Sequence, residues 1–304
     1  MQWKDTLFIP IEMKLTGAIL HLIEDQRNGS SIDQDLVKKI VNSFVSLGLD
    51  DTDTNKKCLD FYKEHFELPF VDATEKYYKQ EAETFLASHS VSDYLKKAEE
   101  RLRQEEDRVD RYLNGETRQP LISKCEQVLI QERSALIRDS FQGFLESEYD
   151  EDLQRMYSLL SRIPEGLEPL QKRFEEHVEQ TGVATISKLV REPGSSAESL
   201  DPKVYVDALL EIHQKYSETV TRSFKSDAGF VESLDKACRQ FVNSNAATGQ
   251  SNSKSRELIV KYADLLLCED NKLVEEGDSE PVLKRVVCCG IPFSPTWLFI
   301  LLAL

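Results

Sequence analysis

The sequence predicts an all-α protein of about ten helices. Apolar residues recur at spacings of three and four along most of the 304 residues, which is the pattern of a helix with one buried face. Helix signals separate these stretches, such as Asp201-Pro202 at a start and Asn114-Gly115 at an end. No stretch shows the alternation of apolar and polar residues that is typical of a half-buried strand.

Five segments of helical spacing lie in the first half of the chain, at residues 3–28, 31–48, 55–87, 91–113 and 120–146. Pro10 suits the first turn of the first segment. Ser31 with Gln34 has the form of a capping box that opens the second. We expect Pro69 to kink or split the third, whose many aromatic residues we interpret as core. The buried face of the fifth is expected to contain Cys125, Val128, Leu129, Leu136 and Phe144.

A short amphipathic helix at residues 152–163 separates this block from a second one, and Pro164 and Gly166 stop it. Helical spacing returns in four further segments, at residues 167–190, 202–224, 228–243 and 256–268. Gly182 is a point at which the first of these could be interrupted. Polar stretches at 191–200 and 246–255 are expected to be loops.

Composition excludes some function classes. The net charge of −16 argues against binding to nucleic-acid phosphates or to anionic membrane surfaces, and leaves basic partners open. Six cysteines lack the C-x-x-C spacing of metal or redox motifs, and we expect Cys125 and Cys238 to fill the core. The first residues lack the apolar run of a secretory signal, so we expect a protein of the cytoplasm and nucleus.

No pattern of catalytic residues emerges. The five histidines lack the spacing of metal-binding helices, and there is no phosphate-binding glycine loop or nucleophile elbow. We interpret the charged run at 101–111 (RLRQEEDRVDR) as a solvated helix face with local ion pairs, with a partner-docking ridge as the alternative. We therefore expect no catalytic, cofactor-binding or metal-binding residues, no cofactor and no enzymatic activity.

Several long motifs carry a family resemblance. They are WKDTLFIPI at 3–11, FLASHSVSDYLKKAEERLRQEEDRV at 85–109, KCEQVLIQE at 124–132, EDLQRMYSLLSRIPEGL at 151–167 and DAGFVESLDKACRQFVNSN at 227–245. In this order they resemble cullins, the elongated helical scaffolds of multisubunit RING-type ubiquitin ligases. The last motif, with the Ser-rich linker and SRELIVKYADLLL that follow, is most similar to the cullin-1 branch.

The resemblance implies an elongated stack of two five-helix cullin repeats. Residues 1–148 would be the second repeat of the family's stalk, residues 149–272 the third, and residues 273–304 a divergent apolar tail. The function implied is a non-catalytic scaffold in ubiquitin-dependent protein catabolism. Its partners would be ubiquitin ligase subunits or the family's stalk-embracing exchange factor.

The same resemblance implies that parts of the family lie outside these repeats. The first repeat, which grips the Skp1/F-box adaptor, would precede Met1. The region that recruits the RING subunit and carries the Nedd8-modified lysine would follow the third repeat. We therefore expect a truncated stalk fragment, and adaptor-binding, RING-binding and modification residues cannot be placed on this sequence.

The tail leaves three interpretations open. Residues 286–304 carry no charge over 19 positions, near the length that spans a bilayer, and Lys284-Arg285 precede them. Gly290, Pro292 and Pro295 interrupt the stretch. It could be a non-native product of a truncated or mis-spliced frame, a membrane tail anchor, or a segment packed on the last helices. The alternative functions are accordingly a tail-anchored helical adaptor and an unrecognised helical enzyme.

Overall fold

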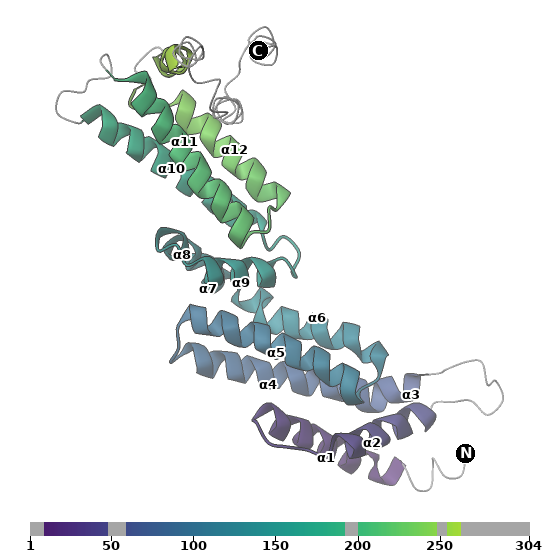
Figure 1. Ribbon diagram of the computed structural model, residues 1–304. Coiled ribbons are helices and arrows are strands. Elements are labelled where there is room, and N and C mark those ends of the chain that lie inside the picture. The colour runs from purple at the N-terminus through teal and green to yellow at the C-terminus, as the bar shows by residue number, and fades with distance from the viewer. Residues whose placement is uncertain (1–8, 48–58, 192–199, 248–253, 263–304) are drawn as a thin grey trace, which may run out of the picture. The chain divides into compact units, whose positions relative to one another are not determined.

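The computed structural model describes residues 9–47, 59–191, 200–247 and 254–262, and all its regular elements there are helices (Figure 1). The all-α prediction is therefore confirmed for this part of the chain. The expected tail at 273–304, most of both expected polar loops and the end of the expected helix at 256–268 lie outside the described residues.

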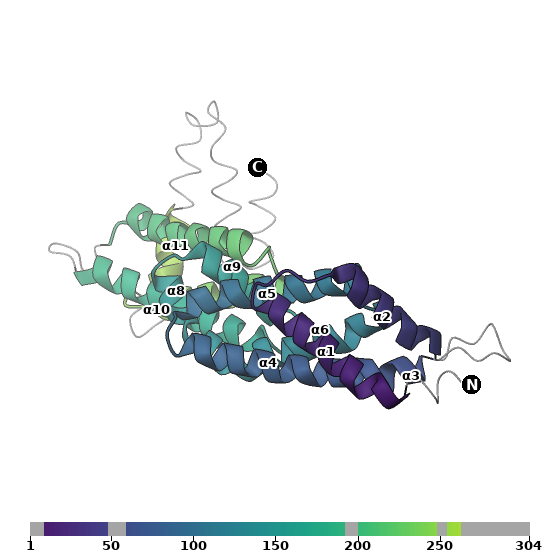
Figure 2. The same ribbon diagram turned by 90° about the horizontal axis from the view of Figure 1, so that it is seen from below.

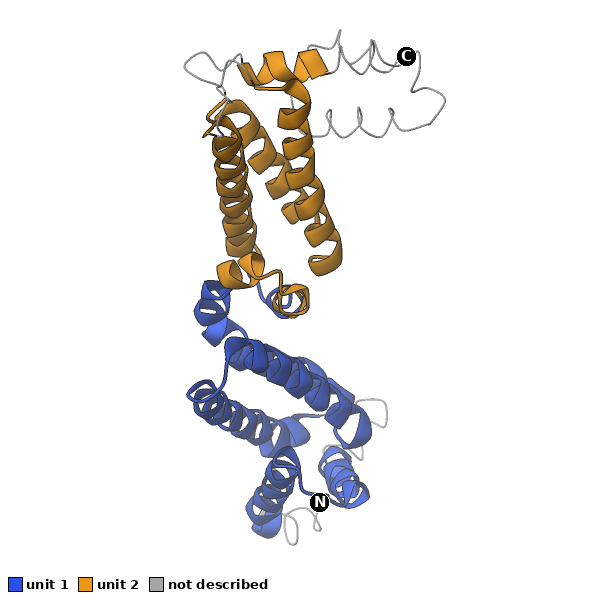
Figure 3. Cartoon of the chain, turned by 60° about the vertical axis from the view of Figure 1, so that its left-hand side comes forward, with its two compact units in different colours: residues 1–140, 158–166 blue, residues 141–157, 167–304 orange. Residues whose placement is uncertain are grey.

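The chain divides into two compact units (Figure 3). Residues 1–140 and 158–166 form unit 1, and residues 141–157 and 167–304 form unit 2. Helix α9, Asp150–Leu160, contributes residues to both units. The predicted repeat boundary between residues 148 and 149 stays a prediction.

Unit 1 is built from five main helices, which are α1 Ile9–Arg27, α2 Gln34–Leu47, α4 Leu68–Leu86, α5 Val91–Tyr112 and α6 Arg118–Leu129. Figure 2 shows α1 and α2 lying across one side of α4 and α5. The aromatic residues of the third predicted segment fill the space between these helices, as expected for core. Those buried there are Phe61, Tyr62, Phe66, Phe70 and Tyr78.

The start of α2 differs from the expected capping box. The Asp33 side chain accepts a hydrogen bond from the Leu36 backbone N–H at 2.9 Å, so Asp33 occupies the capping position assigned to Ser31. Both residues have short polar side chains suited to the cap, and the choice shifts the helix start by two residues.

Pro69 acts through a π-helical turn instead of a break. The short helix α3, Asp60–Tyr62, continues through the π-turn Lys63–Glu67 directly into α4. Pro69 has no N–H, so the carbonyl of His65, four residues earlier, lacks its usual donor. The hydroxyl of Thr16 on α1 donates to this carbonyl at 3.1 Å. The carbonyl that Pro69 leaves without its usual helical donor thus forms a hydrogen bond to α1.

Replacing Thr16 by Val is expected to destabilise unit 1 by about 1–3 kcal/mol, because a half-buried carbonyl loses its donor. Combined with Pro69→Ala, which restores a backbone N–H to α4, the same replacement should cost clearly less. Urea denaturation of the wild type and the three variants measures this coupling. Equal costs in both backgrounds would show that Thr16 does not compensate for Pro69.

The fifth predicted segment is not one helix. It is divided into α6, the 3₁₀ turn Gln131–Arg133, α7 Ser134–Asp139 and α8 Phe141–Glu146. Val128, Leu129 and Ile130 are all buried, which a single face of a straight helix cannot achieve. The Tyr94 hydroxyl donates to the Leu129 carbonyl at 2.9 Å, taking the place of the next helical N–H. Beyond the break, Leu136 is 42% exposed, so its predicted burial is wrong.

Unit 2 is built mainly from α10 Glu168–Arg191, α11 Pro202–Ser223 and α12 Ala228–Asn243. Helix α10 runs unbroken through Gly182, where the interruption was considered. A Cβ atom at Gly182 would lie 2.5 Å from the Phe241 ring of α12, so this glycine permits close packing of the two helices. The Asp201 side chain caps α11 at the Lys203 N–H, 2.8 Å away, as predicted.

The turn after α9 closes tightly within unit 1. A Cβ atom at Gly166 would lie 2.0 Å from the Leu160 carbonyl oxygen, and Glu165 has a φ of 55°. Arg162 forms ion pairs with Glu106 and Glu126, each at 3.3 Å. The motif that separates the two predicted blocks thus anchors its end on α5 and α6.

His177 joins three helices of unit 2. Gln142 of α8 donates to its Nδ1 at 2.9 Å, and its Nε2 lies 2.8 Å from the Tyr216 hydroxyl of α11. The Tyr216 hydroxyl in turn donates to Thr181 at 3.3 Å. These partners fit a neutral ring. Burial lowers the pKa of His177 from its ordinary value of 6.5, and Lys215 adds to this while Glu146 opposes it.

Unit 2 is therefore expected to lose stability as the pH falls below about 6.5. The unfolded chain takes up a proton at the ordinary histidine pKa, whereas the folded chain resists it because its pKa is lower. Thermal unfolding of the wild type and His177→Gln between pH 7.5 and 5 measures the effect. The variant should show a smaller decline over this range, and an identical decline would contradict the assignment.

Candidate functional site in a buried arginine–glutamate network

A charged network lies in the interior of unit 1, centred on Glu105 of α5. The Glu105 side chain is fully buried, and its Oε1 accepts a hydrogen bond from Arg27 Nε at 2.9 Å. The same oxygen accepts from Arg108 Nη1 and from the Tyr78 hydroxyl. Both arginines are only 5% exposed. One carboxylate oxygen thus holds groups from α1, α4 and α5.

Arg27 is the C-terminal residue of α1, and the end of this helix sets its position. A cation is favoured there by the helix dipole. Its Nη2 donates to Thr74 Oγ1 at 2.7 Å, and its guanidinium lies 5.2–5.6 Å from the ring centres of Phe70, Tyr77 and Tyr78. The end of α1 is therefore bound to α4 by hydrogen bonding and by cation–π contacts.

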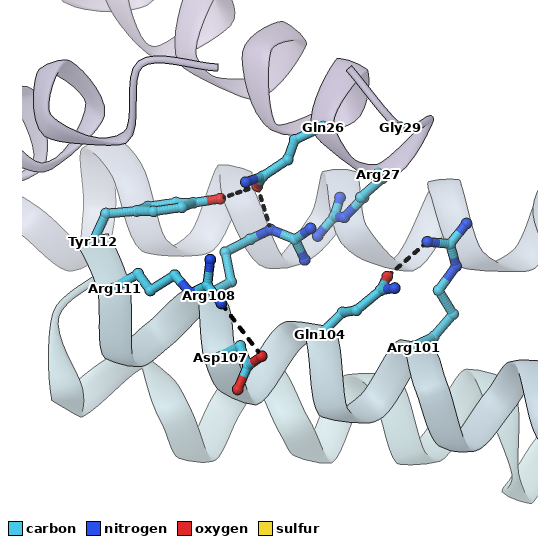
Figure 4. A pocket seen from close by; sticks show the side chains of 9 residues that line it. All are labelled: Gln26, Arg27, Gly29, Arg101, Gln104, Asp107, Arg108, Arg111 and Tyr112. Atoms are coloured by element: carbon cyan, nitrogen blue, oxygen red, sulfur yellow. Dashed lines mark hydrogen bonds and ion pairs between the residues drawn. The ribbon is translucent and has the colours of Figure 1, made fainter. Parts of the chain in front are cut away.

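Gln26 extends the network toward the surface. Its Oε1 accepts hydrogen bonds from Arg108 Nε at 3.1 Å and from the Tyr112 hydroxyl at 2.6 Å (Figure 4). Gln26 and Arg27 are adjacent at the end of α1, whereas Arg108 and Tyr112 are one turn apart on α5. Two neighbouring residues of α1 thus bond to successive turns of α5.

The network is charged in the folded protein. Burial raises the pKa of Glu105, but Arg27 and Arg108 lower it by a larger amount, so the net shift of this pKa is downward. Burial lowers the pKa of Arg27, but the neighbouring groups, Glu105 first among them, raise it by more. The net shift of the Arg27 pKa is therefore upward. Burial and the Glu105 charge raise the pKa of Tyr78 well above its ordinary value. One carboxylate therefore lies between two arginine cations.

A pocket of about 290 Å³ opens beside the network, between the end of α1 and α5 (Figure 4). Four arginines line it, which are Arg27, Arg101, Arg108 and Arg111, together with Asp107. Arg101 pairs with Glu81 of α4, and Arg111 lies 3.8 Å from Asp107. The site can hold charge in a fixed position, but it brings together no nucleophile and base.

The interpretation of residues 101–111 as a solvated face is wrong for its centre. Arg103 and Arg111 do make exposed local ion pairs, with Glu100 and Asp107 respectively. Glu105 and Arg108 instead face the core. The available signal was the register, because Glu105 falls on the same stripe as Leu102 and Val109. Sequence reasoning missed it because its cationic partner Arg27 is 78 residues away.

In the part of the chain that the structure describes, the other residues weighed for chemistry do not assemble into a site. Within the described ranges, no group of His, Cys, Asp and Glu side chains could hold a metal ion. Cys125 and Cys238 are buried, as predicted, and burial raises the pKa of the Cys125 thiol far above its usual range. A thiol in this state is not a nucleophile.

Packed helices around a buried structural network define the class as an all-α helical fold. The family description "Cullin alpha solenoid domain" matches residues 1–289. The chain belongs to the cullin family. This match runs past residue 272, where the sequence analysis places the end of the resemblance.

Individual relatives agree. The chain is 45% identical to Cullin-1 of Dictyostelium discoideum over 287 residues, 39% identical to Cullin-1 of Schizosaccharomyces pombe and 38% identical to Cullin-1 of Caenorhabditis elegans. Each comparison covers 94% of this chain and 37% of the relative. The chain thus spans little more than a third of the length of these relatives.

Proposed function

We propose that this chain is a stalk segment of a cullin scaffold in a ubiquitin ligase complex of the SCF type. The observation that carries the proposal is the identity of 38–45% to three cullin-1 proteins over 94% of the chain. The proposed role lies in ubiquitin-dependent protein catabolism, in the cytoplasm and nucleus.

The mechanism is geometric and needs no catalytic side chain. Packed helices hold the two ends of a stalk at a set separation, which raises the effective concentration of a bound substrate near a ubiquitin-charged enzyme. The buried network supports this role, because it ties α1, α4 and α5 by directional bonds as well as by apolar packing. Flexing these helices against one another would separate buried charges, which is costly.

The proposal assigns partners by class only. Ubiquitin ligase subunits, or an exchange factor that embraces the stalk, would contact the surfaces of the helices. In this proposal the regions that bind the Skp1/F-box adaptor and the RING subunit lie outside the two repeats that we propose for residues 1–272. The proposal therefore covers the stalk alone.

A chimera tests this function. Residues 9–262 of this chain would replace the matched segment of Dictyostelium discoideum Cullin-1, and ubiquitin transfer to a bound substrate would be followed in a reconstituted reaction. We expect transfer comparable to that of the parent protein. A folded chimera that assembles with its subunits but transfers no ubiquitin would refute the proposal.

The competing proposal is a helical adaptor anchored in a membrane by residues 286–304. No helix within the described ranges is long and apolar enough to span a bilayer, and this tail lies outside them. Carbonate extraction of the expressed full chain separates the two proposals. Retention in the membrane pellet would favour the anchor, and release into the supernatant would exclude it.

A further inference from the structure

The pocket beside the network is positively charged on a protein of net charge −16. Three carboxylates face its four arginines. Glu105 is shared by Arg27 and Arg108, Glu81 pairs with Arg101, and Asp107 lies near Arg111. Lys97 also pairs with Glu81 at 3.1 Å, so the cations of these ion pairs outnumber the carboxylates.

The excess charge originates in the interior. Within the described residues, the ion pairs give Arg27 and Arg108 only the Glu105 carboxylate between them. The pKa of Arg108 is raised overall, with burial and the charge of Arg27 opposing the charge of Glu105. Figure 4 shows the two guanidinium groups next to each other at the centre of the pocket. A buried cation without its own counter-charge is costly, and an anion bound in the pocket would offset that cost.

The rim of the pocket offers a group that can reach such an anion. The Arg111 side chain is 59% exposed, and its contact with Asp107 at 3.8 Å is longer than a hydrogen bond. A guanidinium presents its N–H groups as a planar fork that matches the oxygens of a phosphate or carboxylate. Arg111 can therefore turn toward an oxyanion without leaving a strong existing bond.

We propose that this pocket binds a phosphate-type oxyanion, held by Arg108 at its floor and Arg111 at its rim. A volume of about 290 Å³ accepts one phosphate group or one phosphorylated side chain. It falls just below the range typical of pockets for whole cofactors. The ligand chemistry is the phosphate monoester dianion, whether free or carried by a partner protein. Its binding would tie α1 more firmly to α5.

The test uses the full chain and two single variants. Inorganic phosphate is titrated at constant ionic strength and followed by calorimetry or phosphorus NMR. Arg111→Gln removes the rim contact. Arg103→Gln is the matched control, because Arg103 lies on the same helix, has a 65% exposed side chain and pairs with Glu100 outside the pocket.

We expect saturable binding that Arg111→Gln weakens at least about fivefold, as for loss of one charge-assisted contact, while Arg103→Gln leaves it within about twofold. Circular dichroism establishes that both variants fold. A titration without saturation, or equal losses in the two variants, would overturn the proposal, because either result means that only the general charge of the surface matters.

A second arm identifies the source of the phosphate. A short phosphoserine peptide and its unphosphorylated form are titrated in the same way. Tighter binding of the phosphopeptide than of inorganic phosphate identifies a partner's side chain as the ligand, and weaker or equal binding identifies free phosphate. Binding of the unphosphorylated peptide with equal affinity would count against a phosphate site altogether.

Discussion

Replacing Glu105 by Gln is expected to lower the free energy of unfolding of unit 1 by about 3–5 kcal/mol, because it leaves two buried arginines without their shared counter-charge. Urea denaturation followed by circular dichroism measures the loss. Glu100→Gln on the exposed side of the same helix should leave the denaturation midpoint nearly unchanged.

Two further measurements separate a charge effect from a packing effect. Simultaneous replacement of Arg27, Glu105 and Arg108 by Met, Leu and Leu should recover most of the lost stability, since apolar residues of similar volume often replace a buried ionic cluster well. The acid sensitivity should change as well. The lowered pKa of Glu105 supplies stability above its ordinary value of 4.5 that is lost as the pH falls through the folded pKa. Glu105→Gln should remove this contribution, and an acid transition unchanged in the variant would contradict the assignment.

Replacing Phe174 by Ala is expected to destabilise unit 2 by about 3–5 kcal/mol, because it empties the centre of an aromatic cluster. The Phe174 ring is fully buried and lies edge-on to Tyr216, Phe224 and Phe230, with centroid separations of 5.6–5.8 Å. These partners come from α11, the turn after it and α12, so one ring of α10 joins the three long segments of the unit.

Hydrogen exchange read on peptides from α10, α11 and α12 measures this loss directly. Tyr149→Ala is the size-matched control, since Tyr149 is an aromatic residue of unit 2 that is 56% exposed. Protection should fall throughout the three helices in the Phe174 variant and stay near the wild-type level in the control. Equal changes in the two variants would show that the cluster does not hold the unit together.

Local signals in the sequence were enough for many of the helices. The bounds of α12 at Ala228–Asn243 agree with those expected, and α5 ends within one residue of the prediction. The start of α11 follows from Asp201, whose side chain caps the helix, and from the proline after it. Each of these features depends on residues within one or two turns, which is why spacing and capping rules reach them.

Features that depend on distant partners could not be predicted in this way. The end of α6 follows from the hydroxyl of Tyr94, 35 residues away, and the π-turn before Pro69 is supported by Thr16 of α1. Gly182 resembles a helix breaker in sequence, but its role depends on the Phe241 ring of another helix.

The candidate site likewise combines features that local sequence signals predict with features that depend on distant partners. Helical spacing over residues 91–113 predicts α5, and Glu105 lies on the buried face of this helix. A glutamate within a charged run nevertheless suggests a solvated side chain unless its buried partner is known. Family membership, by contrast, followed from long motifs in order and is confirmed by the match over residues 1–289.

The proposed role of this chain as a rigid spacer can be tested by comparing two inserts in the same scaffold. Residues 9–262 of this chain, or a Gly/Ser linker of the same length, replace the matched segment of Dictyostelium discoideum Cullin-1, and the initial rate of ubiquitin transfer is measured. A flexible linker keeps both ends connected but spreads their separation over a wide range. We expect the helical insert to support transfer and the linker to fail, although both bind the same subunits. Equal transfer by the two inserts would contradict it.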